Sequence, residues 1–198
     1  MNATTTPEEL ARQQVVDVAD RLFYARGIQS VPMDELRTEA GVSLKRMYSL
    51  FPSKETLVAA VLRGRNATWT AGILERASRV DAPREKLLAI FDFLADWFAQ
   101  DDFRGCAFIN SFGEMGATAP AVADAARAHK TSFQTYVADL VREAGAPEWL
   151  APQLALLAEG AQTTAAISGL PDAATSARAA ASTLIDAAIG ESPEFPTE

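Results

Sequence analysis

The regular return of apolar residues at helical spacing, along almost the whole chain, is the feature that most limits what this sequence can fold into. Apolar side chains recur at helical intervals in successive segments, and no stretch convincingly alternates apolar with polar residues as a strand would. Glycine and proline interrupt the pattern at positions that suit helix ends. We therefore predict an all-α fold of about nine helices.

These interruptions predict where the helices begin and end. The expected ranges are about 7–26, 32–40, 44–50, 54–78, 83–100, 120–144, 148–168 and 172–189, with a shorter apolar segment at 101–116. We expect the hydroxyl groups of Ser30, Ser43 and Ser53 to cap the second, third and fourth helices. Gly27 and Gly41 are expected to end the first and second helices with positive φ angles.

Composition places the chain among soluble globular proteins. Of its 198 residues 48% are hydrophobic, which permits a substantial core, and no apolar run is long enough to span a bilayer. The N-terminal stretch lacks the basic start and apolar centre of a signal peptide, and the single cysteine, Cys106, rules out an internal disulfide framework. We expect a cytoplasmic protein, with residues 191–198 forming a disordered tail.

The distribution of charge restricts how the chain could bind nucleic acid. The net charge is −8, yet residues 1–55 hold seven Lys or Arg against eight Asp or Glu, so nearly all of the excess negative charge lies beyond residue 55. Screening over about 8 Å at physiological salt separates the two regions electrically. Any attraction to DNA must therefore come from a local cationic patch.

The segment Met33–Leu62 contains two short helical patterns separated by a tight turn. Leu36 and Ala40 before the turn and Met47 after it can form a small shared core, and Gly41 permits the sharp change of direction. This arrangement is typical of a helix-turn-helix.

The outward side of the second of these helices carries hydrogen-bond donors. Lys45 and Arg46 can reach the two acceptors of guanine in a major groove, a contact that discriminates between bases by about 1–3 kcal/mol, and Tyr48 and Lys54 are suitably placed for phosphates. Two adjacent cations on a short helix are also typical of a solvated surface, so the pair alone does not establish DNA binding. The predicted DNA-contacting residues are Ser43, Leu44, Lys45, Arg46, Tyr48, Ser49 and Lys54.

The order and spacing of a larger set of residues extend this interpretation. The residues are Phe23, Gly27, Leu36, Ala40, Gly41, Val42, Ser43, Tyr48, Phe51, Pro52, Lys54 and Leu57. With these spacings, the segment over about residues 8–66 resembles the N-terminal DNA-binding domain of the TetR family of transcriptional regulators. Small residues are common in the family at the positions of Lys45 and Arg46, so the operator sequence does not follow from the resemblance.

The resemblance implies a second domain at residues 67–190, which binds an effector and forms a homodimer through the last two long helices. Two stripes of apolar and small residues support such a dimer, although an intramolecular core would produce the same stripes. The predicted dimer residues are Leu150, Leu154, Leu157, Ala161, Thr164, Ala177, Ala181, Leu184 and Ala188.

The middle helices are expected to enclose a small, largely apolar effector. Ligand pockets are mostly apolar with a few polar anchors, but aromatic residues at helical spacing are also the usual content of a core. The candidate lining residues are Trp69, Ile73, Phe91, Leu94, Phe98, Cys106, Ile109, Asn110, Phe112, Met115, His129 and Phe133. Asn110, Glu114 and His129 are the candidate polar anchors. With no third ligand at a recognisable spacing, Glu114 and His129 do not predict a metal site.

Together with these patterns, the resemblance implies a ligand-responsive repressor that binds a palindromic double-stranded DNA operator as a dimer and is released by its effector, with no cofactor. An enzyme is one alternative, but the sequence has no phosphate-binding loop, dinucleotide fingerprint or nucleophile elbow, and no catalytic residue is predicted. A helical interaction module that reuses the fold is another. It would show no salt-dependent DNA binding.

Overall fold

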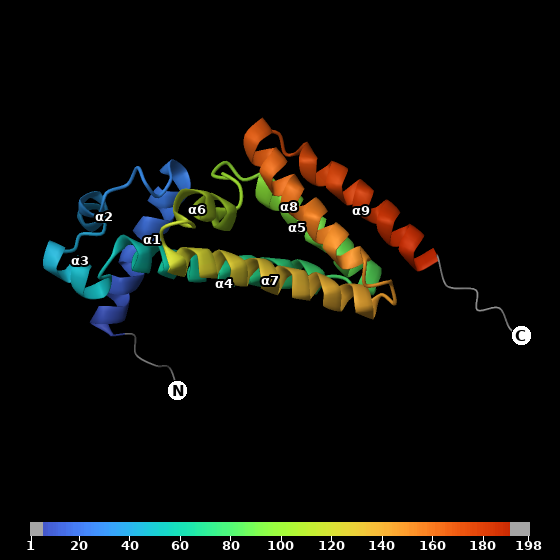
Figure 1. Cartoon of the computed structure of the whole chain (residues 1–198), viewed down its shortest axis with the longest axis horizontal. Helices are drawn as coiled ribbons and strands as arrows, with labels where there is room; N and C mark the ends of the chain where they lie inside the picture. The colour runs from blue at the N-terminus through green and yellow to red at the C-terminus, as the bar shows by residue number, and fades with distance from the viewer. Residues whose placement is uncertain (1–5, 191–198) are drawn as a thin grey trace, which may run out of the picture. The chain divides into compact units, whose positions relative to one another are not determined.

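The computed structural model describes residues 6–190, and within that range it contains nine helices and no strand (Figure 1). The helices are α1 (Pro7–Arg26), α2 (Met33–Glu39), α3 (Leu44–Leu50), α4 (Lys54–Ala77), α5 (Pro83–Phe98), α6 (Ala107–Met115), α7 (Pro120–Glu143), α8 (Leu150–Ser168) and α9 (Asp172–Gly190). The all-α prediction is confirmed. The tail predicted at residues 191–198 lies outside the described range.

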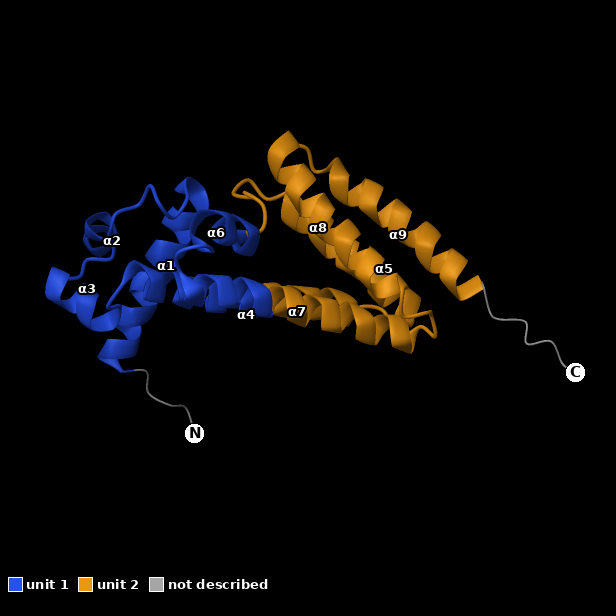
Figure 2. Ribbon diagram, in the orientation of Figure 1, with its two compact units in different colours: residues 1–67, 107–128 blue, residues 68–106, 129–198 orange. Residues whose placement is uncertain are grey.

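The helices group into two compact units, shown in different colours in Figure 2. Unit 1 comprises residues 1–67 and 107–128, and unit 2 comprises residues 68–106 and 129–198. Both α4 and α7 therefore contribute residues to each unit. The sequence predicts a single division near residue 66, whereas the structure groups α6 and the first part of α7 with the N-terminal helices.

The first helix shows how local sequence fixes its ends. Thr6 caps α1: its hydroxyl accepts the backbone N–H of Glu9, and the Glu9 carboxylate accepts the backbone N–H of Thr6 at 2.7 Å. At the other end Gly27 has a φ of 83°, and its N–H donates to the carbonyl of Phe23 at 2.9 Å. This reciprocal pair and the positive φ explain why α1 begins and ends where the chain pattern predicts.

One predicted cap is wrong. The Ser30 hydroxyl, expected to cap the second helix, instead donates to the carbonyl oxygens of Arg26 and Gly27, at 2.6 and 3.1 Å. It satisfies acceptors left over at the end of α1. Helix α2 begins after Pro32 and has no side-chain cap.

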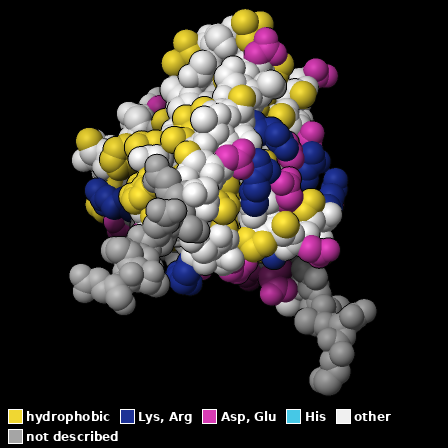
Figure 3. All heavy atoms as spheres, turned by 90° about the vertical axis from the view of Figure 1, so that its right-hand side faces the viewer, with side chains coloured by type: hydrophobic (Ala, Val, Ile, Leu, Met, Phe, Trp, Pro, Cys, Tyr) yellow, Lys and Arg dark blue, Asp and Glu magenta, His cyan; other side chains and the backbone are white. Residues whose placement is uncertain are grey.

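Unit 2 is built around α5, α8 and α9, which pack against one another and enclose its core. Two ion pairs link α5 to α9: Arg178 with Asp92 at 2.6 Å, and Arg84 with Asp186 at 2.7 Å. Figure 3 shows one face of the molecule on which acidic and basic side chains are intermingled on one side and hydrophobic side chains gather on the other. In the described part of the chain, no helix is both long enough and apolar enough to cross a membrane.

Candidate nucleic-acid interface

The turn between α2 and α3 depends on a glycine conformation. Gly41 has a φ of 63°, in the left-handed region that residues with a Cβ rarely adopt. The turn is closed by the N–H of Val42, which donates to the carbonyl of Arg37 at 3.0 Å. Ser43 then caps α3, because its hydroxyl accepts the N–H of Arg46 at 3.2 Å. Gly41 and Ser43 therefore act as predicted, reversing the chain and starting the second short helix.

One side of α3 is fixed against the rest of unit 1. Met47 and Leu50 are buried, as is Phe51, which follows the helix. The guanidinium group of Arg12 on α1 donates to the carbonyl of Leu50 at 2.9 Å and lies 4.3 Å from the centre of the Phe51 ring. The sequence pattern did not identify this role for Arg12, because the contact joins residues 38 positions apart.

The opposite side of α3 faces solvent. Leu44, Lys45, Tyr48 and Ser49 are exposed, and Arg46 is partly exposed. The predicted DNA-contacting residues of α3 thus form one continuous outer surface, here called the α3 surface, which consists of Ser43, Leu44, Lys45, Arg46, Tyr48 and Ser49.

Lys54 differs from the other predicted contacts. It opens α4, and its ammonium nitrogen lies 5.8 Å from the centre of the Phe23 ring. Burial lowers the pKa of Lys54, and the negative charge of Glu114 opposes that effect. Lys54 is half-buried and lies at the start of α4, so it is not part of the α3 surface.

The cations of unit 1 differ in whether a carboxylate neutralises them. Arg21, Arg26 and Arg37 pair with acidic side chains of α2 at 3.2, 2.5 and 2.7 Å, respectively. Within residues 6–190, neither Lys45 nor Arg46 forms an ion pair. The α3 surface consequently presents two positive charges that no acidic neighbour cancels, although the chain as a whole is acidic.

Glu114 makes a backbone contact that the sequence does not predict. Its carboxylate faces the segment that follows α1, where it accepts the backbone N–H groups of Ile28 and Gln29 at 3.0 and 2.8 Å, and it also lines a pocket of unit 1. The role of Glu114 as an effector anchor stays a prediction, and its observed hydrogen bonds are structural contacts within unit 1. No local pattern indicates this contact, because it joins residues more than eighty positions apart.

The predicted effector residues divide between the two units. In unit 2, Trp69 lies edge-on to His129 and to Phe133, with ring centres 4.9 and 5.2 Å apart. Ile109, Asn110, Phe112 and Met115 instead belong to unit 1, where Phe112 is exposed. The remaining predicted lining residues of unit 2 are buried, and they are Ile73, Phe91, Leu94, Phe98 and Cys106. The structure brings together an aromatic cluster, defined here as Trp69, His129 and Phe133.

His129 is the titratable member of this cluster. Burial lowers the pKa of His129 to about 4, with a smaller contribution from the neighbouring charge of Lys130. The imidazole is therefore neutral near pH 7. It can act there as a hydrogen-bonding group but not as a cation.

The predicted dimer residues lie mainly inside a single chain. Leu157 and Leu184 are partly buried and Thr164 is exposed, while the others are buried, namely Leu150, Leu154, Ala161, Ala177, Ala181 and Ala188. The opposite side of α8 leaves Leu156 and Ile167 exposed by 71% and 83%. Dimerisation through α8 and α9 stays a prediction, and the side chains available for it lie on this opposite stripe.

Two family models match the chain. Residues 15–61 match the model of bacterial regulatory proteins of the tetR family, and residues 83–181 match the model of a tetracyclin repressor-like C-terminal domain. The first match contains the whole α2–turn–α3 segment, and the second extends from α5 into α9.

Solved and curated proteins show the same similarity. The structure superposes on a TetR-family transcriptional regulator from Streptomyces coelicolor with a TM-score of 0.84 and 26% identity, over 90% of this chain and 96% of that one. The activator FasR of Mycolicibacterium smegmatis is 29% identical over 140 residues, which is 70% of this chain and 63% of that protein. The HTH-type regulator Rv1255c of Mycobacterium tuberculosis is 34% identical over 80 residues, 40% of each chain.

Proposed function

The chain belongs to the TetR family of bacterial regulatory proteins, a family of transcriptional regulators rather than enzymes, and on this premise we propose that it represses transcription by binding DNA through the α3 surface. Two observations support the DNA-binding role. The α3 surface lies within the matched N-terminal region, and it carries Lys45 and Arg46 without acidic partners.

The α3 surface suits a major groove. An α-helix fits that groove, where Lys45 and Arg46 can donate to the O6 and N7 acceptors of guanine. Tyr48 and Ser49, on the same surface, can donate to phosphate oxygens and so fix the register of the helix. The proposal depends on the observation that, among the described residues, no carboxylate pairs with Lys45 or Arg46.

The proposed operator is palindromic because we propose that the protein binds as a homodimer. A two-fold dimer presents two copies of α3, and half-sites in successive major grooves lie about 34–36 Å apart. The exposed stripe of Leu156 and Ile167 on α8 supports a contact between copies, because large apolar side chains in water favour burial.

We propose that a small, largely apolar effector binds in unit 2 at the aromatic cluster of Trp69, His129 and Phe133, and lowers operator affinity. Helix α4 supports this coupling, since it contributes Trp69 to unit 2 and begins directly after the α3 segment of unit 1. The effector acts only through its different affinities for the two states of the protein. A hundredfold loss of operator affinity corresponds to about 2.7 kcal/mol of coupling.

Selection of bound sequences from random duplex DNA tests the DNA-binding proposal directly. We expect a palindromic consensus, and binding to it that weakens steeply as salt rises. Replacing both Lys45 and Arg46 with alanine should remove this binding while helicity and oligomeric state persist. A double variant of Arg127 and Arg142 to alanine is the control, because it makes the same charge change on exposed arginines outside the α3 surface. Equal binding by the two double variants would rule the proposal out.

Activation of transcription is a second candidate function, favoured by the similarity to the activator FasR. The two functions differ in their effect on a promoter that carries the selected sequence. In transcription reactions with purified polymerase, a repressor lowers the transcript and an activator raises it.

A further inference from the structure

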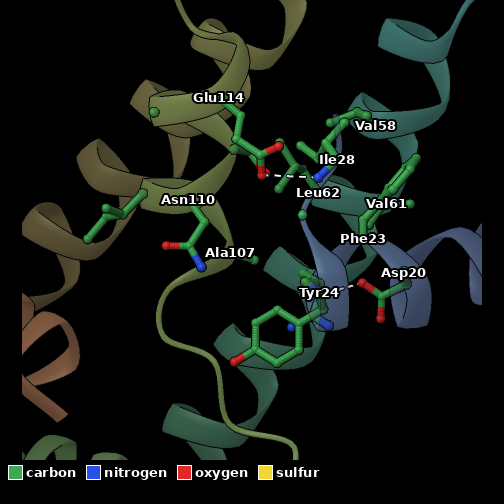
Figure 4. A pocket seen from close by; sticks show the side chains of 15 residues that line it. Asp20, Phe23, Tyr24, Ile28, Val58, Val61, Leu62, Ala107, Asn110 and Glu114 are labelled. Carbon is green, nitrogen blue, oxygen red and sulfur yellow. Dashed lines mark hydrogen bonds and ion pairs between the residues drawn. The ribbon is translucent and has the colours of Figure 1, made fainter. Parts of the chain in front are cut away.

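Unit 1 contains a cavity of about 440 Å³ between α1, α4 and α6, shown in Figure 4. Its walls come from residues 20–28 of α1 and the segment after it, 58–65 of α4, and 107–114 of α6. The volume lies within the range of about 300–1,000 Å³ that is typical of small-molecule sites. Ile109, Asn110 and Glu114, which we predict from the sequence to belong to the effector pocket, line this cavity, whereas the aromatic cluster of unit 2 does not.

Part of the lining is apolar and rigid. Phe23, Ile28, Val58 and Leu62 are all buried in the core of unit 1 and line the cavity. Side chains held by close packing keep their positions when a ligand enters. These residues therefore offer a preformed surface for the hydrocarbon body of a small molecule.

One wall already holds a cation. The guanidinium group of Arg65 on α4 forms an ion pair with Asp20 on α1, and its central carbon lies 3.7 Å from the centre of the Tyr24 ring. A carboxylate beside an aromatic face is a favourable environment for positive charge. Asp20 and Tyr24 thus show what kind of group this wall accepts.

The charges that line the cavity sum to a negative value. Asp20 and Glu114 each contribute a carboxylate, Arg65 contributes the only cation among the lining residues, and Lys54, whose pKa burial lowers and the charge of Glu114 raises, lies outside the lining. Each carboxylate oxygen can accept more than one hydrogen bond, so both groups keep acceptor capacity beyond their present partners. A ligand anion would meet two carboxylates, whereas a ligand cation would meet one guanidinium group.

We propose that this cavity binds a small organic cation, an ammonium group attached to an apolar body. The ammonium group donates to the carboxylates of Asp20 and Glu114, and the body lies against Phe23, Ile28 and Leu62. This proposal concerns binding to unit 1 alone and stands apart from the function proposed above.

Calorimetric titration of the full chain without DNA tests the proposal with three probes that share a phenyl body. We expect 2-phenylethylammonium to bind at least about tenfold more tightly than the neutral 2-phenylethanol and the anionic 3-phenylpropanoate, because only the cation complements the lining charge. Equal affinities, or tighter binding of the anion, would overturn the proposal. Since no DNA is present, the outcome does not depend on the regulatory function.

Two variants locate the binding in the cavity. Arg65→Met removes the resident cation and should tighten ammonium binding several-fold, whereas Arg79→Met, which makes the same charge change at an exposed ion pair of α4 and the loop after it, should not. Ala107→Phe places a ring in the cavity and should abolish binding. Circular dichroism establishes that each variant is folded. Unchanged ammonium binding by a folded Ala107→Phe protein would also refute the assignment.

Discussion

The carboxylate of Glu114 accepts the backbone N–H of Ile28 at 3.0 Å, joining α6 to the segment that follows α1. The second oxygen of the same carboxylate accepts the N–H of Gln29 at 2.8 Å. Both N–H groups lie beyond the end of α1, and the carboxylate of Glu114 is the acceptor that they have there. Glu114 therefore satisfies two donors in the segment that leads into the helix-turn-helix.

Replacing Glu114 with alanine should lower the free energy of unfolding by about 1–3 kcal/mol, because the N–H of the buried residue Ile28 loses its acceptor. Hydrogen exchange at the amides of Ile28 and Gln29 should accelerate. The control is Glu75→Ala, which removes a carboxylate from an exposed ion pair and should change stability by no more than about 0.5 kcal/mol. Equal losses in the two variants would contradict the role of Glu114.

We predict that replacing glycine with alanine has opposite effects on stability at Gly41 and at Gly64. A Cβ added at either position meets no atom within 4 Å, so packing does not distinguish them. Gly41→Ala should destabilise the protein by about 1 kcal/mol, because Gly41 has a φ of 63°. Gly64→Ala should stabilise it by up to about 1 kcal/mol, because Gly64 lies inside α4. Urea unfolding of both variants measures the two signs, and a shared sign would show that φ is not the deciding factor.

The parts of the structure that could be predicted from the sequence depend on neighbours in the chain. Gly41 and Ser43 determine the α2–α3 turn through local conformation and capping, and the α3 surface follows from helical spacing. The contacts of Arg12 and Glu114 could not be predicted, because they join residues that are far apart in sequence and carry no periodic signal. The faces of α8 were also ambiguous. Leu154 and Leu156 are similar in type, and only the packing of α5 and α9 determines which of them is buried.

His129 should make stability depend on pH in the acidic range. Its pKa is about 4 in the folded chain and about 6.5 when unfolded, so between these values the unfolded chain binds the proton. Above about pH 6.5, His129 therefore does not reduce the free energy of unfolding. As the pH decreases towards 4, this free energy falls by on the order of 3 kcal/mol in total. Urea unfolding at pH 7 and pH 4.5 should show a larger loss for the wild type than for His129→Gln. Parallel pH dependences in the two proteins would exclude this effect of His129, since the carboxylates are common to both.

We predict that the exposed stripe of α8 forms the contact between two copies of the chain. Leu156 and Ile167 are exposed by 71% and 83%, so replacing both with glutamate leaves the core of one chain intact but places charges in the proposed dimer contact. We expect the dissociation constant of the dimer to rise by about a hundredfold or more, because a buried unpaired charge costs several kcal/mol. Sedimentation equilibrium measures this change, and circular dichroism should report an unchanged helix content.

Two further variants distinguish a dimer that forms through Leu156 and Ile167 from one that forms through another surface. Leu74→Glu changes an exposed apolar residue on α4 and should leave the dimer intact. Leu154→Glu changes a residue that is 1% exposed, on the stripe that the sequence predicts for the dimer, and should unfold the chain rather than dissociate it. If Leu154→Glu instead produced folded monomers while the Leu156 and Ile167 double variant stayed dimeric, the copies would associate through the stripe that is buried in this structure.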